Sequence, residues 1–449
     1  MSESESDEKL GQSLARVSTA EADERNSQSH DGGTESSASP PAHDAEGGLE
    51  GWLNVFGSVL VYFATFGIIN SFGFFQSYYE KGFLSEYQPA VIAFIGTLQI
   101  ALLYVMSPIA GSLFDAYGLK RLYAGAGFGC ALSLVLLSLS QPGQLWAPFL
   151  TQGLLFGLCS AFGIQPALSV AGQYFQKRRA LAMGIVAAGS SIGGVTFPFL
   201  FSGLIPILGF GWTLRLCALI CIVCYAVAIL VSNPRQPPQP LKSARELLDF
   251  GGYRDLRYSL LAVGTFVGNL GLYVPYYYIE SYALTLLPAM EQPSGVVSAL
   301  LPLINASSLF GRVLGGQAAD KLGRLNVLWP VATLCGILCL LFWIFATNIP
   351  SVIAFSILYG FCSGVWISVT PAVVGEITPK DKLGARIGAF FSLTAIAALA
   401  GSPIAGALIR DSAKRTGYLP LIAFSGATLL LGGLLQGWAK IIIRRDRSQ

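Results

Sequence analysis

Long apolar segments separated by short polar turns make up most of this 449-residue chain after Gly51. The first runs from about Leu53 to Phe75 and the second from Ala90 to Phe114. Each is long enough to cross a hydrocarbon core of about 30 Å as a helix of roughly 20 residues. Residues 122–176 contain no charge, so the turn at residues 141–144, Gln-Pro-Gly-Gln, must divide them into two helices. Segments 180–201 and 213–231 complete a first group of six predicted spans.

A second group of apolar segments begins near Tyr258 and ends near Ala439. Polar turns interrupt it at residues 288–294, 323–326, 348–351, 379–383 and 410–417. The pattern therefore predicts an all-α membrane protein with twelve transmembrane helices in two six-helix bundles. The expected parts are an acidic tail (1–50), a first bundle (51–232), a linker (233–257), a second bundle (258–439) and a basic tail (440–449).

Composition supports this interpretation, because 53% of the residues are apolar and only 12% are charged. A soluble globular protein of this length needs far less apolar surface. The first fifty residues differ from the rest, since they hold twelve of the 25 acidic residues and both histidines, His30 and His43. We expect this segment to be disordered, either as a phosphorylated regulatory arm or as a solvated leader. It lacks the basic and apolar regions of a signal peptide.

Basic residues in the short loops predict the orientation, because translocated loops are depleted of lysine and arginine. Most of them follow even-numbered predicted helices, as do the basic residues of the linker and of the C-terminal tail. That face is expected to be cytoplasmic, with both termini inside, and the plasma membrane is the expected location. One loop disagrees, because Arg410, Lys414 and Arg415 fall on the opposite face.

The two predicted bundles share a repeated motif. Gly111-x-x-x-Asp115-x-x-Gly118-x-Lys120 recurs 205 residues later as Gly316-x-x-x-Asp320-x-x-Gly323-Arg324. The same offset relates Pro166-Ala167 to Pro371-Ala372 and Pro198 to Pro403. A repeat of this period indicates two superposable bundles with a substrate site between them near the bilayer midplane.

The repeated loop is similar to the signature that follows the second and eighth helices of the major facilitator superfamily. Its acids lie at helix ends among cations with which they can pair. In the first copy Ala116 stands where that signature usually has a cation, so we expect weaker pairing there. The residues expected to act in gating are Asp115, Lys120, Arg121, Lys177, Arg178, Arg179, Asp320, Lys321 and Arg324.

A second motif narrows the resemblance. Residues 174–184, Tyr-Phe-Gln-Lys-Arg-Arg-Ala-Leu-Ala-Met-Gly, continue to Gly189 and Gly193 and resemble the fifth-helix signature of the monocarboxylate porter family. Glu50-Gly51-Trp52 resembles the end of that family's first-helix signature. The small residues let this helix pack closely, and the basic run anchors it in anionic headgroups.

Arg312 is the one ionisable residue that falls clearly inside a predicted span. A charge at the bilayer centre costs a few kcal/mol, so such a residue is a functional hypothesis by default. Asn305 and Ser308 share its helical face. A guanidinium matches a carboxylate with two parallel hydrogen bonds, which predicts that Arg312 binds an anionic group of a substrate. Pairing with Asp320 is the structural alternative.

The family resemblance also implies two charges that this chain lacks. Proton-coupled monocarboxylate porters have an aspartate one turn before the matching arginine and a lysine in the first helix, where this chain has Ser308 and Asn70. Lactate-type symport is therefore in doubt. Uniport, antiport and coupling through Glu280 or Glu376 remain open.

Other polar and aromatic residues are expected near the cavity. The predicted substrate-contacting set comprises Asn70, Asn269, Tyr273, Tyr277, Asn305, Ser308, Arg312, Trp366 and Thr370. Tyrosine supplies apolar contact and a directed hydrogen bond, so this set favours a bulkier substrate than lactate.

These features predict a secondary transporter for an organic anion or an aromatic metabolite, with efflux as the expected direction. Uptake of a monocarboxylate or of a vitamin such as riboflavin is the alternative, and a membrane sensor that does not transport is a second class. We expect no enzymatic activity, cofactor, metal or nucleic-acid partner. The expected partners are a small-molecule substrate and the lipid bilayer, with the oligomeric state open.

Overall fold

A computed structural model describes residues 47–175, 178–235, 240, 248–287, 295–378 and 383–446, and gives the backbone alone at 383–385 and 444–446. The predicted acidic tail and the turns at 288–294 and 379–382 therefore lie outside the described residues, apart from residues 47–50 of the tail. The described residues belong to one compact unit.

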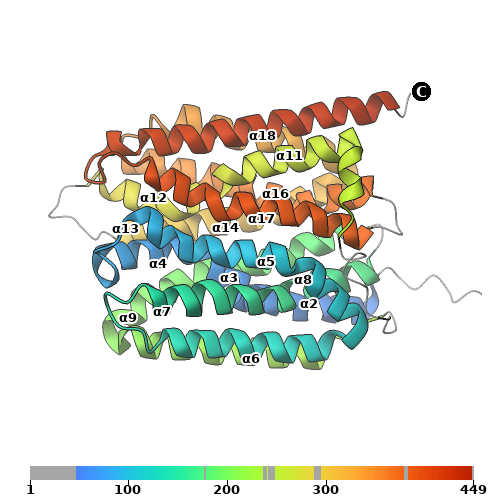
Figure 1. The fold of residues 1–449 in the computed structure, drawn as a ribbon, viewed down its shortest axis with the longest axis horizontal. Helices are drawn as coiled ribbons and strands as arrows, with labels where there is room; N and C mark the ends of the chain where they lie inside the picture. The colour runs from blue at the N-terminus through green and yellow to red at the C-terminus, as the bar shows by residue number, and fades with distance from the viewer. Residues whose placement is uncertain are drawn as a thin grey trace, which may run out of the picture. The chain divides into compact units, whose positions relative to one another are not determined.

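Helices of the first half occupy one side of this unit, and helices of the second half occupy the other (Figure 1). Two of the first-half segments, η1 and η2, are π-helical. The first half comprises α2 (Gly48–Ala64), α3 (Phe66–Asn70), α4 (Phe72–Tyr78), η1 (Tyr79–Phe83), α5 (Pro89–Tyr117), α6 (Leu119–Leu137), α7 (Trp146–Pro148), η2 (Phe149–Phe156), α8 (Gly157–Tyr174) and α9 (Arg179–Val231).

In the second half, α11 begins two residues before the predicted start of the bundle, and α18 continues through most of the predicted basic tail. This half comprises η3 (Phe250–Arg254), α11 (Leu256–Leu272), α12 (Val274–Leu284), α13 (Gly295–Ser298), α14 (Leu300–Leu322), α15 (Arg324–Ile337), η5 (Leu338–Trp343), α16 (Ile349–Ile377), α17 (Leu383–Ala407), η7 (Arg415–Tyr418) and α18 (Leu419–Asp446).

Ten helices among the described residues are long and apolar enough to cross a membrane. One of them, α9, has 53 residues and contains two helices that meet at Gly209, where φ is 79° and ψ is 164°. The first apolar segment is divided among α2, α3 and α4, so no single helix of it reaches full length. With these two cases resolved, the described residues form twelve spans, six in each half, as the hydrophobic pattern predicts.

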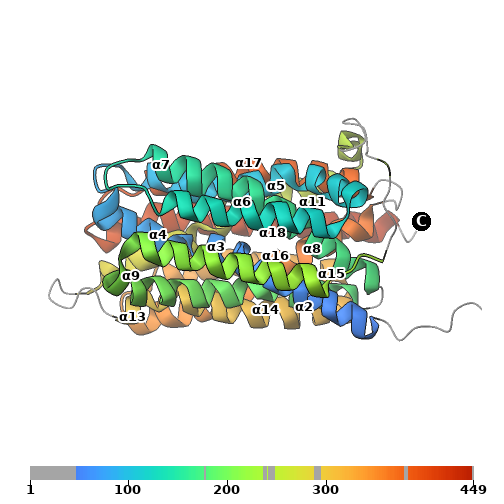
Figure 2. The same cartoon turned by 90° about the horizontal axis from the view of Figure 1, so that it is seen from below.

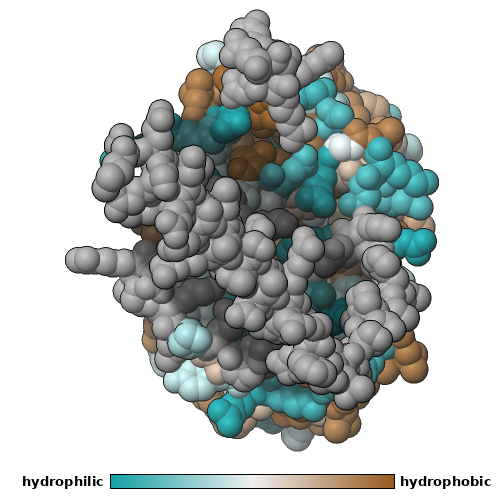
Figure 3. Space-filling view, turned by 90° about the vertical axis from the view of Figure 1, so that its right-hand side faces the viewer, coloured by the Kyte–Doolittle hydropathy of each residue, from teal (hydrophilic) through white to brown (hydrophobic). Residues whose placement is uncertain are grey.

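The repeated motif ends equivalent helices in the two halves. Gly118 ends α5 with φ 80°, and Gly323 ends α14 with φ 93°. A backbone at such positive φ strongly favours glycine, which explains why both copies keep it. Both glycines lie at the end of the unit that carries Lys120, Arg121, Arg178, Lys321 and Arg324, which we call the basic end. Figure 3 looks onto this end, where hydrophilic residues gather among those drawn in colour. The opposite end is called the distal end.

Among the described residues, the boundary between the halves is formed mainly by α9 with α14, α5 with α17, and α4 with α12, with a smaller contact between α9 and α16. Figure 2 shows α9 and α14 side by side. Glycines permit this close approach. A Cβ atom added at Gly316 would meet the carbonyl oxygen of Ala180 at 2.7 Å, and one added at Gly184 would meet that of Arg312 at 2.5 Å. The small residues of the fifth predicted span therefore bring it into backbone contact with the eighth.

Close glycine packing within the first half gives a testable prediction. A Cβ at Gly193 would lie 2.6 Å from Cα of Gly67, whereas one at Gly203 of the same helix has no atom within 4 Å. Overpacking of this kind costs about 1–3 kcal/mol. We expect Gly193→Val to lower the thermal unfolding midpoint in detergent and Gly203→Val to leave it nearly unchanged. An equal decrease of the thermal unfolding midpoint in both variants would contradict the proposed backbone contact.

Candidate functional site

Arg312 lies midway along α14 and is completely buried, with an exposed fraction of 0%. Its Nε atom donates to Oγ of Ser308 at 3.2 Å, one turn earlier on the same helix. Its Nη1 atom donates to the carbonyl oxygen of Ala187 at 2.7 Å and to the hydroxyl of Ser190. Ala187 and Ser190 belong to α9, so this side chain joins the two halves across their boundary.

Ser190 connects a second predicted residue to the same place. The Nδ2 atom of Asn70 donates to Oγ of Ser190 at 3.4 Å, and Asn70 ends α3 in the first span. Asn70, Ser190, Ser308 and Arg312 are all buried, and we call them the central cluster. Asn70 and Ser308 therefore both lie close to Arg312. They occupy the positions at which the family resemblance implies a lysine and an aspartate.

The central cluster leaves one arginine nitrogen without a partner. Among the described residues, Nη2 of Arg312 is buried and makes no hydrogen bond. A buried, unsatisfied donor on a charged group is costly, so each such group in a native protein needs an explanation. Among the described residues no ion pair joins Arg312 to Asp320, and the Asp320 carboxylate instead accepts a hydrogen bond from a backbone N–H near the start of α9.

Tyrosines surround the guanidinium in place of carboxylates. The tyrosines near enough to interact with it electrostatically are Tyr62, Tyr104, Tyr273 and Tyr276. The hydroxyls of Tyr104 and Tyr273 lie 3.3 Å apart and belong to opposite halves. Tyr104 also stacks on Phe391 of α17, with ring centroids 5.2 Å apart. The arginine therefore lies among aromatic rings contributed by both bundles.

The remaining predicted contact residues are buried but lie at varying distances from this cluster. Asn305 packs against Gly194 of α9 and keeps a buried Oδ1 atom without a partner among the described residues. Tyr277 packs on Phe72 across the boundary, with centroids 5.1 Å apart, and its hydroxyl has no partner within the described part of the chain.

Asn269, Trp366 and Thr370 make no hydrogen bond with Arg312 among the described residues. Asn269 donates to the Thr265 carbonyl of its own helix, and Thr370 donates to the Trp366 carbonyl. Trp366 packs against Gly268, whose missing side chain leaves room for its ring. Their role in binding stays a prediction.

The basic end holds a contact between the halves. Oδ2 of Asp320 accepts a hydrogen bond at 3.0 Å from the backbone N–H of Leu181, in the first turn of α9. Acceptors at this position satisfy an exposed helix donor and complement the helix dipole. Arg324 donates to the Ala372 carbonyl at 3.1 Å, within its own half. The second copy of the motif thus caps a helix of the first half.

Other residues predicted for gating have varied surroundings. Lys120, Arg121, Arg178 and Lys321 are exposed, and Asp115 is half-buried. Asp115 and Arg178 also have interaction partners. Nε of Arg179 is buried without a partner among the described residues. Lys177 lies outside the described residues.

The distal end holds a second contact between the halves, which the sequence analysis missed. Oε2 of Glu80, in η1, accepts a hydrogen bond at 3.0 Å from Ser281 of α12. Gln76 steadies the same carboxylate by donating to Oε1 at 2.6 Å. Contacts between the halves are therefore present at both ends and at the central cluster. The sequence analysis also missed Ser190. The signal that could have found it is that Ser190 and Ser191 are the two polar residues in a run of small apolar residues.

A model of the Major Facilitator Superfamily matches residues 54–346 and 294–447. The chain belongs to this superfamily. It is 34% identical over 395 residues to "MFS transporter asaE" of Aspergillus flavus, covering 88% of this chain and 87% of the relative. It is 36% identical to "Aspyridones efflux protein apdF" of Emericella nidulans, covering 88% and 79%. It is 35% identical to "Agnestins efflux protein AgnL12" of Paecilomyces divaricatus, covering 87% and 88%.

Solved structures share the fold of the superfamily. The human organic anion transporter MFSD10 (TETRAN) superposes with a TM-score of 0.64 at 15% identity, over 86% of this chain and 98% of that one. A point mutant of the nucleoside transporter NupG superposes with a TM-score of 0.66 at 14% identity, over 85% and 99%. The chain is a multi-pass membrane transporter with the two-bundle architecture of the superfamily.

The Asp320 contact gives a second prediction. Removing a helix-capping acceptor costs about 1 kcal/mol, which corresponds to roughly fivefold faster amide exchange if opening is local. We expect Asp320→Ala to accelerate hydrogen exchange at the start of α9, and Asp320→Asn to have a smaller effect because its amide oxygen can still accept. Asp411→Ala is the matched control, since Asp411 accepts from Ala413 within one exposed turn. Unchanged exchange at Leu181 in Asp320→Ala would contradict the contact.

Proposed function

We propose that this transporter moves a flat organic anion across the membrane by alternating access, with the carboxylate of the substrate bound by Arg312. The observation that carries the proposal is the buried Nη2 atom, which makes no hydrogen bond among the described residues. A carboxylate would satisfy it with a charge-assisted bond, which is about twice as strong as a neutral one.

A bound anion would also change the contact between the halves. Nη1 of Arg312 holds Ala187 and Ser190 of α9. A carboxylate that binds both terminal nitrogens competes with these neutral acceptors for Nη1. Substrate binding would thereby exchange a bond between the halves for a bond to the substrate, and the boundary at the cluster would loosen. This exchange links occupancy to the rocking of one bundle against the other.

Alternating access needs contacts that open in turn at the two ends. Asp320 with Leu181 at the basic end and Glu80 with Ser281 at the distal end are suited to this role, because each joins the two halves through a single carboxylate. The similarity of the repeated loop to the superfamily signature supports a gating role for the contact of Asp320 with Leu181. The contact of Glu80 with Ser281 is the corresponding contact at the distal end.

The tyrosine surroundings support a flat substrate. An aromatic ring offers its face to another planar group and its hydroxyl to a directed hydrogen bond. The fifth-helix motif and the position of Arg312 support a place near the monocarboxylate porters within the superfamily. Ser308 and Asn70 stand where those porters have their proton-linked charges, which supports a substrate other than lactate.

Efflux is the direction we propose. Relatives of this chain are named as efflux proteins for aspyridones, agnestins and fujikurins. We propose a secondary metabolite as the cargo and the plasma membrane as the location. The basic end would face the cytoplasm, because cytoplasmic loops carry the excess of lysine and arginine, and both chain termini would lie on that side.

A flux assay in proteoliposomes tests the proposal. The panel contains a planar aromatic carboxylic acid, its neutral methyl ester, lactate and riboflavin. Losing charge-assisted bonds costs about 1.5–3 kcal/mol, so Arg312→Gln should slow acid flux about 10- to 100-fold. We expect Arg312→Lys to be impaired too, because a lysine cannot reproduce the planar fork.

Arg215→Gln is the matched control for this assay. Arg215, near the start of the sixth span, donates to Ser138 at 3.2 Å and stacks over Trp212, and both of these contacts lie within its own half. The Arg215→Gln variant should transport the acid at nearly the rate of the unmodified protein. Acid flux at the unmodified rate in both Arg312 variants would overturn the role of this arginine. Movement of lactate or riboflavin alone would favour the uptake alternative.

A further inference from the structure

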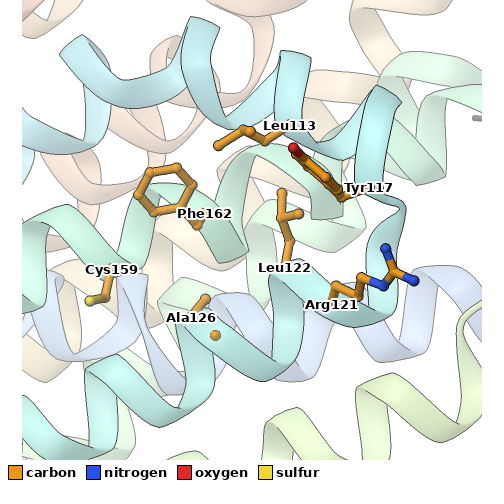
Figure 4. A pocket seen from close by; sticks show the side chains of 8 residues that line it. Leu113, Tyr117, Arg121, Leu122, Ala126, Cys159 and Phe162 are labelled. Atoms are coloured by element: carbon orange, nitrogen blue, oxygen red, sulfur yellow. The ribbon is translucent and has the colours of Figure 1, made fainter. Parts of the chain in front are cut away.

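A groove opens on the flank of the first half, away from the central cluster. It has a volume of about 340 Å³ and is formed by α5, α6 and α8 (Figure 4). Its walls are apolar side chains from all three helices, with two polar groups toward the basic end, Tyr117 and Arg121. The lining residues are Leu113, Tyr117, Arg121, Leu122, Gly125, Ala126, Cys159 and Phe162.

The groove owes part of its space to a glycine. A Cβ atom added at Gly125 would have no atom within 4 Å, so this position faces open space. Four residues later, at Gly129, an added Cβ would meet Sγ of Cys159, so α6 and α8 are in close contact there. The groove therefore begins near the start of α6 and closes about 6–12 Å deeper along the helix, at 1.5 Å per residue.

The surroundings indicate that lipid covers this groove. Along α6, beyond the groove, Phe128 is 68% exposed, and Leu132, Val135 and Leu136 are also exposed. In a membrane-spanning helix such a face contacts acyl chains. Tyr117 and the exposed Arg121 lie at the mouth, beside the Gly118 turn between two spans, where lipid headgroups are expected. In Figure 4 the guanidinium of Arg121 lies at the end of the row of lining side chains, away from Phe162 and Cys159.

The charge at the mouth selects the headgroup. A guanidinium binds phosphate oxygens with two parallel hydrogen bonds, and a phenol hydroxyl such as that of Tyr117 can add a third. Lys120, the neighbouring residue, is exposed and adds positive potential. Basic pockets between transmembrane helices recognise anionic lipid headgroups in this manner.

We propose that this groove is a binding site for an anionic phospholipid, with one acyl chain between α5, α6 and α8 and the headgroup phosphate on Arg121. The lipid would bridge helices on both sides of Gly118, the turn that joins α5 to α6. It would therefore stabilise the first copy of the repeated loop, whose Ala116 replaces the cation usual in that signature. The site is independent of the substrate bound at Arg312.

The test uses the purified full-length protein in detergent with phosphatidylserine or phosphatidylcholine of the same acyl chains. Bound lipid is counted by native mass spectrometry, and the thermal midpoint is recorded in parallel. We expect phosphatidylserine to bind about fivefold more tightly than phosphatidylcholine, because one basic residue beside an anionic headgroup strengthens binding by about that factor. Gly125→Leu fills the groove and should abolish binding of both lipids.

Arg121→Gln and Lys120→Gln form the matched pair. Arg121→Gln should remove most of the preference for phosphatidylserine and should weaken phosphatidylcholine binding to a smaller extent, because both headgroups carry the phosphate that Arg121 binds. Lys120→Gln should retain most of the preference. Equal loss in the two variants would overturn the proposal, because it would reveal general attraction to a basic surface. Unchanged lipid binding in Gly125→Leu, with the variant folded as judged by its thermal midpoint, would also overturn it.

Discussion

A guanidinium without access to water must find acceptors for its protons, and this requirement organises the centre of the transporter. Arg312 meets it with a serine of its own helix and with a carbonyl and a hydroxyl of the opposite half. These acceptors are neutral, and one guanidinium nitrogen has no partner within the part of the chain that the structure describes. The arrangement holds the bundles together, yet an anion would bind the same group more strongly. A bond between the halves that a substrate can replace is what a rocking mechanism needs.

The approach of α9 to α14 makes that bond possible. Gly184 and Gly316 let the two backbones meet without intervening side chains, so the arginine reaches across a short distance. The capping of α9 by Asp320 acts on the same pair of helices at the basic end, while Glu80 and Ser281 join another pair at the distal end. Because each contact depends on one carboxylate and few donors, each can break without disturbing the packing inside either bundle. Rocking of rigid bundles as such contacts break and form is the route we propose for alternating access.

Much of this arrangement follows from local pattern. The spans, the turn at residues 141–144 and the paired loops could be predicted because hydrophobic length and glycine positions act over short stretches. The burial of Arg312 and its proximity to Ser308 follow from helical periodicity. Ser190, Tyr104 and the Glu80 contact could not be placed, because they depend on which helices of the two halves face each other. The break at Gly209 falls between the predicted segments 180–201 and 213–231, whereas the division of the first span escaped prediction, since the hydrophobic pattern continues through it.

The most direct measurement is the structure of the protein bound to the proposed anionic substrate, at a resolution that shows the guanidinium. We predict a substrate carboxylate oxygen within about 3 Å of Nη2 of Arg312, together with lengthened contacts from Nη1 to Ala187 and Ser190. A substrate bound elsewhere, with both contacts to α9 intact, would contradict the account.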